Sequence, residues 1–400
     1  MTDLTSLAAT ENRDLMPVLD WLLQAGQRLA SLGQIIKELG PRLVAAGLPV
    51  ARIRVNFRTL HPEIVASAYV WTAESGIREN RVGHGLVNSD AYLGSPIQTM
   101  FEELREVHHR LLDTDLSAAH SILQELQNDG YGDYFGIPLH FSDGRRAALM
   151  LCSSPGVLFS ESDLAKLRLV ACVLAPFAEL HSMRRIAGSL LDTYLGHRTG
   201  QKVLQGMIRR GDSDLIRAAL WFSDLRDFTL HTEMLAPALL LEMLNTYFEF
   251  VAAAVAARGG EILRFIGDAM LIVFPTDLHG DDARACDAAL EAAEDAFAGL
   301  ATLNHRRRRR AEPEIEFGVG LHIGDVIYGN VGAPSRLDFT VMGTSVNRTA
   351  RLEQLTKTVG SPLLMSERFA ALVSAETRLL GRHPMKGVEG EQSVFGLAEQ

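Results

Sequence analysis

Hydrophobic and polar positions divide the chain into two halves with different orders of predicted elements. In the first half, residues 17–47 carry apolar side chains at helical spacing and reach a glycine stop at Gly47. Apolar and polar residues then alternate over 51–60 and 64–73, which predicts two strands. This half therefore begins with helical structure and continues with a sheet.

The same half ends with a predicted hairpin and a helix. Two apolar runs flank Ser142-Asp143-Gly144, a strong turn signal, so residues 134–154 are predicted to form a β-hairpin. Residues 159–180 are amphipathic at helical spacing. A capping pattern from Ser160 to Asp163 predicts where this helix begins.

The second half alternates strands and helices in the order βαββαβ. The pattern predicts a strand, a helix, a hairpin, a helix and a strand over residues 217–222, 235–257, 261–274, 281–303 and 315–321. This order is the split βαβ plan of ferredoxin-like folds. We therefore expect an α+β protein, with a four- to five-stranded antiparallel sheet in this half and helices on one face of it.

Residues 183–214 lie between the two halves and mix helical spacing with glycines. Two interpretations stay open for this segment. It is either a helical joint that passes a signal between the halves or a plain linker.

Composition and charge narrow the classes of function. Hydrophobic residues make up 47% of the chain and charged residues 22%, which is typical of a globular protein. The formal net charge of −10 argues against binding of nucleic acid or of an anionic membrane surface. The basic run from His305 to Arg310 is followed by three glutamates, so we interpret it as a solvated loop.

The cysteines and apolar runs favour a cytoplasmic location. Cys152, Cys172 and Cys286 are far apart and form no CxxC pair, so neither a disulfide framework nor a zinc site is predicted. The most apolar helix-like run, residues 167–180, is shorter than the ~20 residues of a membrane span. The N-terminus has no basic segment typical of a secretory signal.

Two aspartates stand at the ends of predicted core strands. Asp224 follows the strand at 217–222, and Asp268 follows Gly267 inside the predicted hairpin. Either residue alone would be read as part of a turn. In a ferredoxin-like sheet, however, the first strand and the central hairpin are neighbours, so both carboxylates meet at one edge. A divalent cation would relieve their repulsion, and oxygen ligands favour Mg²⁺ or Mn²⁺. This indicates a metal site, with two ions, for phosphoryl transfer.

A second pair of polar residues, Asn347 and Arg351, lies one helical turn apart on a predicted helix. Such a pair suits a phosphate whose charge grows in the transition state. We expect Val346, Ala350 and Leu355 to anchor this helix. The alternative is a solvated face on which Arg351 pairs with Glu353 or Glu367.

Five segments of the second half stand in the order found in class III nucleotide cyclases, and residues 216–397 resemble that family. The segments are "FSDLRDFT", "GGEILRFIGDAMLIVF", "GLHIGDVIYGNVG", "LDFTVMGTSVNRTARLE" and "MKGVEG". The resemblance implies a homodimer with two composite sites at its interface. It also implies conversion of a nucleoside triphosphate, ATP in the first instance, to the 3′,5′-cyclic monophosphate and pyrophosphate.

The resemblance assigns roles to matching positions. Asp224 and Asp268 match the metal-binding aspartates, and the turn that includes Leu225, Phe228 and Thr229 matches the loop that holds the terminal phosphates. Asn347 and Arg351 match the transition-state pair of the opposite protomer. Lys386 resembles the phosphate-binding lysine. The group that takes the proton from the ribose 3′-hydroxyl stays open between Asp224 and a water molecule.

Two further positions match those that select the base. Arg264 stands where adenylate cyclases commonly have lysine and guanylate cyclases glutamate, and Thr340 stands where many adenylate cyclases have aspartate. An arginine can donate to adenine N1, whereas guanine presents a donor there, so ATP is favoured over GTP. Thr340 resembles the bicarbonate-responsive subgroup. Asp227, at a common glycine position, and Gly318, where some members have an arginine, depart from the family.

The first half resembles a GAF-type sensor domain over residues 15–182. We therefore predict a regulatory domain at 1–182, a helical linker at 183–214 and the cyclase domain at 215–400, with an unidentified small molecule or bicarbonate as a regulator. His84, His108 and His109 have no metal-ligand spacing and are interpreted as ordinary histidines. Guanylate cyclase and a non-catalytic nucleotide-binding regulator stay as alternatives. A diguanylate cyclase is disfavoured because no GGDEF-type turn occurs.

Overall fold

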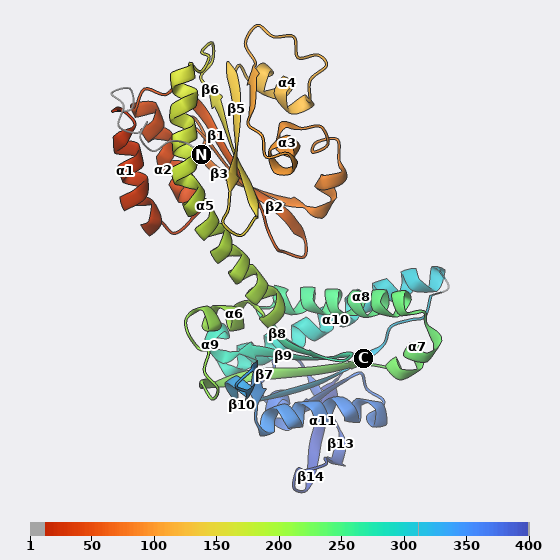
Figure 1. Cartoon of the computed structure of the whole chain (residues 1–400). Helices are drawn as coiled ribbons and strands as arrows, with labels where there is room; N and C mark the ends of the chain where they lie inside the picture. Colours follow the sequence, from red (N-terminus) through yellow and green to blue (C-terminus); the bar gives the residue numbers. More distant parts are fainter. Residues whose placement is uncertain (1–12, 311, 399–400) are drawn as a thin grey trace. The chain divides into compact units, whose positions relative to one another are not determined.

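The chain folds into two α+β units, each built around one β-sheet (Figure 1). The computed structural model describes residues 13–310 and 312–398. The N-terminal unit is Met1–Leu190, and the C-terminal unit is Leu191–Gln400. Each unit has its own buried core.

The N-terminal unit contains a six-stranded antiparallel sheet in the order β3-β2-β1-β6-β5-β4. Its strands are β1 Val50–Arg58, β2 Ile64–Thr72, β3 Gly76–Gly83, β4 Val107–Arg110, β5 Asp133–His140 and β6 Arg146–Ser153. The two predicted strands and the predicted hairpin appear as β1, β2, β5 and β6. The strands β3 and β4 were not predicted, because β3 is mostly polar and β4 has only four residues.

Helices cover both faces of this sheet. One face packs against α1 Met16–Gln24, η3 Gly26–Arg28, α2 Leu32–Ala45 and α5 Glu161–Leu195. The other carries η4 His84–Asn88, α3 Pro96–Glu102 and α4 Ser121–Asn128. The helical pattern of residues 17–47 is thus broken into α1 and α2. The break is at Leu29 and Ser31, whose backbones are extended, and the Ser31 hydroxyl caps α2 by accepting from the Gln34 backbone N–H at 3.2 Å.

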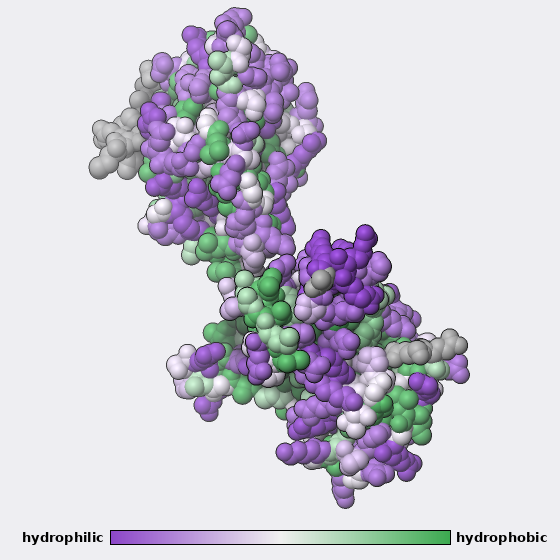
Figure 2. Space-filling model, turned by 90° about the vertical axis from the view of Figure 1, so that its right-hand side faces the viewer, coloured by the Kyte–Doolittle hydropathy of each residue, from purple (hydrophilic) through white to green (hydrophobic). Residues whose placement is uncertain are grey.

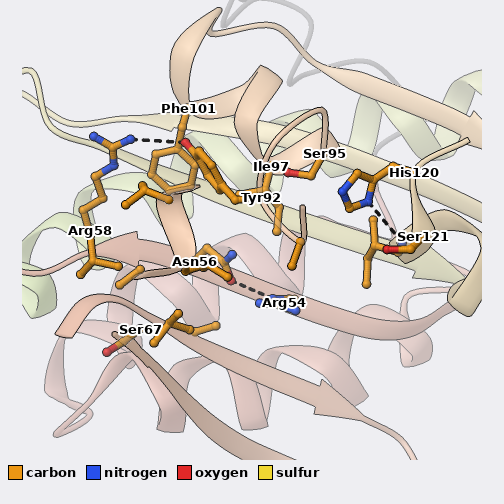
Figure 3. A pocket seen from close by; sticks show the side chains of 18 of the residues that line it. Arg54, Asn56, Arg58, Ser67, Tyr92, Ser95, Ile97, Phe101, His120 and Ser121 are labelled. Atoms are coloured by element: carbon orange, nitrogen blue, oxygen red, sulfur yellow. Dashed lines mark hydrogen bonds between the residues drawn. The ribbon is translucent and has the colours of Figure 1, made fainter. Parts of the chain in front are cut away.

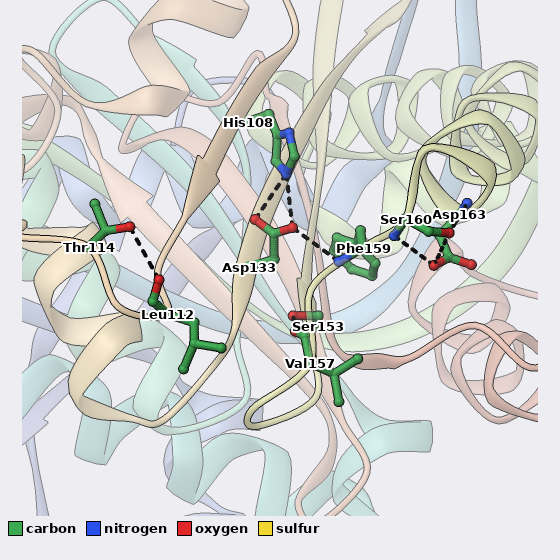
Figure 4. Close-up of polar contacts among 9 residues, drawn as sticks. All are labelled: His108, Leu112, Thr114, Asp133, Ser153, Val157, Phe159, Ser160 and Asp163. Atoms are coloured by element: carbon green, nitrogen blue, oxygen red, sulfur yellow. Dashed lines mark hydrogen bonds and ion pairs between the residues drawn. The ribbon is translucent and has the colours of Figure 1, made fainter.

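A buried carboxylate holds the start of α5 against the sheet (Figure 4). Asp133 is fully buried and accepts from His108 Nε2 at 2.9 Å and from the Phe159 backbone N–H at 3.1 Å. The predicted capping between Ser160 and Asp163 is confirmed, since the Asp163 N–H donates to Ser160 Oγ at 3.1 Å and the Ser160 N–H to Asp163 Oδ2 at 2.9 Å. His108 therefore has a structural partner.

The C-terminal unit contains an eight-stranded sheet in the order β13-β14-β12-β10-β7-β9-β8, with β11 paired to β10. Its strands are β7 Ser213–Leu225, β8 Glu261–Ile266, β9 Ala269–Pro275, β10 Phe317–Ala333, β11 Arg336–Met342, β12 Leu363–Ser366, β13 Thr377–Pro384 and β14 Glu391–Leu397. The predicted four to five strands were too few. The βαββαβ core is present, and the additional strands follow it in the chain.

Helices pack on both faces of this sheet, so the prediction of helices on one face was wrong. On one face, Trp221 of β7 and Leu321 of β10 pack against α8 Pro237–Ala257 and α10 Asp282–Arg309. The opposite face packs against α6 His197–Leu204 and α11 Thr344–Val359. Shorter helices are α7 Phe228–Met234, α9 Thr276–His279 and α12 Glu367–Ala370.

Two glycines of β10 allow α11 to lie close to the sheet. A Cβ at Gly320 would lie 2.5 Å from the backbone of Thr349 and Glu353, and one at Gly324 would lie 2.3 Å from Ser345 Oγ. The buried face of α11 consists of Ser345, Thr349, Leu352, Glu353 and Thr356. The predicted anchors Val346 and Leu355 are only partly buried. Small and hydroxyl-bearing side chains replace them because the helix and the strand are in backbone contact.

The arginine run belongs to a helix and not to a loop. Helix α10 extends to Arg309, where four arginines occupy its last turn and favourably face the negative end of the helix dipole. Arg307 pairs with Glu312 at 3.4 Å and Arg308 with Glu314 at 3.1 Å. The glutamates that follow the run therefore compensate part of its charge.

One helix in the described residues, α8, is long and apolar enough to cross a membrane by length and composition alone. The most apolar run noted in the sequence was a different segment, and no span was predicted. In this structure, Met243, Tyr247, Val251 and Val255 of α8 are buried against the sheet of the C-terminal unit.

The segment 183–214 contains several ordered pieces. Helix α5 continues to Leu195, Gly196 turns the chain with φ of 86°, and α6 follows. Thr199 Oγ1 lies 2.6 Å from the Tyr328 hydroxyl of β10, so α6 packs on the C-terminal sheet. Strand β7 then begins at Ser213, earlier than the predicted 217.

Candidate active site

Asp224 and Asp268 lie together at one edge of the C-terminal sheet. Asp224 is near the end of β7, and Asp268 is in the turn between β8 and β9, where Gly267 has a left-handed φ of 66°. β7 pairs directly with β9, which places the two ends side by side. Burial, and next the neighbouring Asp224 carboxylate, raises the pKa of Asp268 to about 6. The structure therefore brings together the two acids that the sequence singled out.

A lysine lies beside this pair, although no basic partner of the acids was predicted from the sequence. Lys357 Nζ, on the last turn of α11, is 3.9 Å from Asp224 Oδ2. The lysine side chain is 53% exposed, so solvent weakens this ion pair.

A third acid, Glu353, is buried next to the pair. Burial, and next the charge of Asp224, raises the pKa of Glu353 to about 7, against the opposing effect of Arg226. Arg226 Nη1 lies 3.7 Å from Glu353 Oε1, and neither atom has a hydrogen-bond partner in the described residues. From the sequence, Glu353 was considered only as a partner of Arg351 on a solvated face, in the alternative interpretation. The signal that would have revealed it is helical spacing, because Glu353 shares the inner face of α11 with Thr349 and Thr356.

The turn after β7 leads into α7. Leu225 is buried, Phe228 is partly buried against the core, and Thr229 is exposed. Backbone N–H groups in the first turn of a helix have no intrahelical acceptor and are free to bind an anion. Asp227 has a left-handed φ of 52°. This backbone conformation explains why a glycine suits the position and why an aspartate is tolerated there.

Asn347 and Arg351 lie on the outer side of α11. Asn347 is exposed and Arg351 is partly exposed, while the opposite side of the helix packs on β10. Arg351 Nη1 donates to Gln354 Oε1 at 2.7 Å. Neither Glu353 nor Glu367, the alternative partners considered from the sequence, forms this contact.

The carboxylate pair lies beside the beginning of β10, and the start of α11 lies beside its middle. Asp224 is opposite Gly318 in the sheet, whereas Ser345, next to Asn347 in sequence, lies against Gly324. The two glycines are six residue steps apart along the extended strand, which corresponds to roughly 20 Å. Within one chain, the Asn347 region is therefore remote from the two aspartates.

Arg264 and Thr340 lie on two strands, β8 and β11, that are not paired in the sheet but are in contact. Arg264 of β8 forms an ion pair with Asp338 of β11, and Thr340 is two residues further along β11, on the same face as Asp338. Thr340 is buried, with 8% exposure. Asp338 was not assigned a role from the sequence. Its alternation with Thr340 along a strand is the signal that would have linked it to Arg264.

Two remaining positions are simple to place. Lys386 is exposed in the turn that follows β13. Gly318 has no room for a side chain, since a Cβ there would lie 2.6 Å from both Arg226 Nη2 and Thr356 Oγ1. Arg226 thus occupies the space beside Gly318.

The donor atoms at the sheet edge fit a hard divalent cation. Asp224 and Asp268 supply only oxygen ligands, and burial, followed by the neighbouring Asp224 carboxylate, raises the pKa of Asp268; a bound cation would offset both effects. The described residues contain no group of three or more histidine, cysteine or acidic side chains suited to a metal. Any further ligands must then come from main-chain carbonyls, water or a substrate.

The comparisons with known proteins agree with this geometry. Residues 214–398 match the family model described as "Adenylate and Guanylate cyclase catalytic domain". These residues are a class III nucleotide cyclase catalytic domain. The resemblance noted for the second half is thereby confirmed, and members of this family generally use divalent metal ions.

Two curated relatives of the cyclase domain are adenylate cyclases. It is similar to "Adenylate cyclase 1" of Rhizobium meliloti, with 33% identity over 172 residues, and to "Adenylate cyclase" of Anabaena cylindrica, with 35% identity over 164 residues. These matches cover 42% and 40% of this chain and 25% and 31% of the relatives. The chain therefore matches only about a quarter to a third of their length.

Among solved structures, this chain is similar to the adenylyl cyclase CyaB from P. aeruginosa, with 24% identity and a TM-score of 0.44. The match covers 47% of this chain and 96% of the CyaB chain.

Proposed function

We propose that this protein is an adenylate cyclase that converts ATP to 3′,5′-cyclic AMP and pyrophosphate. The observation that carries the proposal is the meeting of Asp224 and Asp268 at the sheet edge of a cyclase domain. Their shared negative charge suits two Mg²⁺ or Mn²⁺ ions and the triphosphate those ions would bring. The adenylate cyclases among the relatives favour ATP as the substrate.

The candidate site residues of this chain would have different roles in the reaction. Asp224 and Asp268 would hold the cations, which supply neutralisation of phosphate charge and activation of the ribose 3′-hydroxyl. The first turn of α7 and Lys386 would bind the terminal phosphates. Asn347 would orient the ribose, and Arg351 would stabilise the charge that develops on the α-phosphate. Because the nucleophile and the phosphate belong to one nucleotide, positioning supplies much of the rate.

The separation of the two groups supports a homodimer with shared sites. Asn347 and Arg351 point away from the sheet of their own chain, so a second copy is needed to place them opposite Asp224 and Asp268. The cyclase domain also exposes apolar side chains that a partner would cover (Figure 2). They are Leu230, Met234, Leu239, Leu241, Phe265 and Ile266. Phe265 and Ile266 directly follow Arg264, which places part of this surface beside the candidate base site.

A guanylate cyclase is the second candidate, and the Arg264–Asp338 pair is the observation that favours it. Arg264 can donate to adenine N1 and Asp338 can accept from the adenine amino group. The same pair can donate to guanine O6 and accept from its N1–H. The preference for ATP or GTP therefore depends on the orientation of the Asp338 carboxylate. Stimulation by bicarbonate through Thr340 would be a further property of this site.

The N-terminal unit supports regulation. We propose that it is a GAF-like sensor, since its six-stranded sheet carries helices on both faces and a cavity on one of them. We further propose that α5 and the rest of residues 183–214 pass the signal on, and that the protein acts in the cytoplasm.

The test is an assay of the purified full chain. ATP, GTP, CTP and UTP are each incubated with Mg²⁺ or Mn²⁺, and the products are identified by mass spectrometry. We expect 3′,5′-cyclic AMP as the main product, and none of it from the Asp268→Ala variant. Formation of no cyclic nucleotide at any protein concentration would reject the cyclase proposal, and preferential formation of cyclic GMP would favour the second candidate.

A further inference from the structure

A cavity in the N-terminal unit lies between the sheet and the helices of its second face (Figure 3). Its volume is about 230 Å³. Its floor comes from β1 and β2, and its walls from η4, α3 and the start of α4. All of these elements belong to the N-terminal unit. The cavity is therefore a feature separate from the cyclase site.

Strand β1 directs a row of polar side chains to this face of the sheet. Ile53, Val55 and Phe57 are buried against the helices of the other face. Because side chains alternate along a strand, Arg52, Arg54, Asn56 and Arg58 face the cavity side. A central strand with three arginines on one face is unusual, since such a face is normally filled with apolar side chains.

Among the described residues, these arginines have no carboxylate partners. Arg54 Nε donates to Asn56 Oδ1 at 2.8 Å, and Arg58 Nη2 is 3.4 Å from the Tyr92 hydroxyl. In the described residues, no ion pair involves Arg52, Arg54 or Arg58. The only acid among the residues that line the cavity is Glu125, which is exposed on α4.

Its surroundings disfavour the charged form of Arg54 when no ligand is bound. Burial, and next the neighbouring Arg52, lowers the pKa of the Arg54 guanidinium. Arg52 and Arg54 also line a small second cavity, which shares Arg54 with the first and is lined by the buried side chains of Tyr134 and Cys152. A partly buried cation in such surroundings is stabilised by an anion that enters the cavity.

The rest of the lining indicates what else the ligand contains. Apolar side chains line most of the cavity, among them Val65, Val82, Leu86, Val87, Ile97 and Ile122. The ring nitrogens of His120 are already used, since Nδ1 accepts from the Ile122 N–H at 3.2 Å and Nε2 lies 2.9 Å from the Asp90 carbonyl oxygen. Asn56, by contrast, is buried, and its Nδ2 donates to no group in the described residues.

We propose that this cavity binds a small organic anion, in which a carboxylate or phosphate is attached to a short apolar body. The anionic group lies against Arg54 and the Asn56 amide, and the apolar body lies among the aliphatic side chains. Arg58 stands at the exposed rim, with its guanidinium 5.4 Å from the centre of the Phe101 ring. This binding does not depend on the proposed cyclase activity.

The test compares anions with neutral molecules that carry the same aromatic ring; benzoate and benzamide also match closely in shape. Binding of benzoate and benzamide, and of phenyl phosphate and phenol, to the full chain is measured by calorimetry. We expect at least one anion to bind ten- to a hundredfold more tightly than its neutral partner, because a charge-assisted hydrogen bond is then satisfied. Preference for benzoate or for phenyl phosphate identifies the anionic group. If neither anion binds better than its neutral partner, the proposal is wrong.

Two arginine variants connect the binding to the site. Arg54→Gln is expected to weaken binding of the preferred anion at least ~10-fold, whereas Arg78→Gln, which alters an exposed arginine on β3, leaves it unchanged. The ligand-free Arg54→Gln protein should melt no earlier than wild type, because an unpaired, partly buried cation has been removed. Unchanged anion affinity in a folded Arg54→Gln protein would overturn the assignment.

Discussion

Arg264 of β8 and Asp338 of β11 form an ion pair at the edge of the cyclase sheet. The pair joins Arg264, the position proposed to select the base, to the strand that carries Thr340. Both side chains remain substantially exposed, at 48% and 43%, so they are open to a nucleotide as well as to each other. The guanidinium supplies donors and the carboxylate an acceptor, which together can read either purine.

We predict that Asp338→Asn raises the preference for ATP over GTP. The variant keeps the Arg264 donor for adenine N1 but replaces the charged carboxylate with a neutral amide, whose oxygen is a weaker acceptor. Guanine N1–H is a more acidic donor than the adenine amino group, so its contact is weakened more, by ~1 kcal/mol or roughly fivefold in the ratio of kcat/KM values. Arg264→Glu should shift the ratio toward GTP, and Arg264→Lys should keep ATP preferred. Equal ratios in wild type and all three variants would show that this pair does not contact the base.

Much of the fold follows from alternation and turn chemistry. The strands β1, β2, β5, β6 and β9 and the helices α5 and α10 were predicted because each is strongly periodic or bounded by clear caps and turns. The missed strands are short or polar, and they form because neighbouring strands supply their hydrogen bonds. Their existence is a property of the assembled sheet and not of their own residues.

The residues of the candidate site also divide into those that could be brought together from the sequence and those that depend on the assembled fold. Asp224 and Asp268 could be paired from the sequence, since strand order places β7 beside β9. Spacing could have placed Glu353 on the inner face of α11 and Asp338 on the same face of β11 as Thr340. That Glu353 and Lys357 lie beside the two aspartates depends on tertiary packing, because Gly320 and Gly324 allow α11 to lie close to β10.

Gly320→Ala should destabilise the cyclase domain. The added Cβ would lie 2.5 Å from backbone atoms of α11, which cannot move aside as a flexible side chain would. We expect a loss of ~1–3 kcal/mol in the free energy of unfolding, measured by urea denaturation. The control is Gly299→Ala in α10, where a Cβ meets open space, and that variant should gain up to ~1 kcal/mol from helix propensity. A Gly320→Ala protein as stable as wild type would mean that α11 does not contact β10 this closely.

His322 of β10 should make the cyclase domain sensitive to acid. Burial, and next the charge of Arg348, lowers the pKa of His322 to about 4, from an ordinary value of 6.5. The neutral imidazole, with Nδ1 2.8 Å from Ser366 Oγ, is thus favoured in the folded state. Its contribution to stability is fully present above pH 6.5 and is lost as the pH falls toward 4, by at most ~1.4 kcal/mol per pH unit. The His322→Asn protein should show a shallower fall in this range when unfolding is measured against pH. Parallel curves for the two proteins would contradict the prediction.

Asp224→Ala and Asp268→Ala should each reduce cyclase turnover at least ~10²-fold, because a cation that holds the phosphates loses a ligand. Both proteins should remain folded, since removal of one carboxylate relieves repulsion in the pair. Turnover is measured at saturating Mn²⁺, together with thermal unfolding. Near-normal turnover in either folded variant would remove that aspartate from the metal site.

Asp224→Ala and Arg351→Ala should restore activity to each other when mixed. Each homodimer lacks one required group at both sites, whereas a heterodimer has one site with intact Asp224, Asp268, Asn347 and Arg351. Random subunit exchange makes half of all dimers heterodimers, so the mixture should regain about a quarter of the wild-type site count. A mixture of Asp224→Ala with Asp268→Ala is the matched control. Its heterodimers still lack one aspartate at every site, so it should stay inactive. If differently tagged subunits are shown to exchange and the first mixture remains as inactive as this control, Arg351 does not act on the aspartates of the partner, and the composite site is wrong.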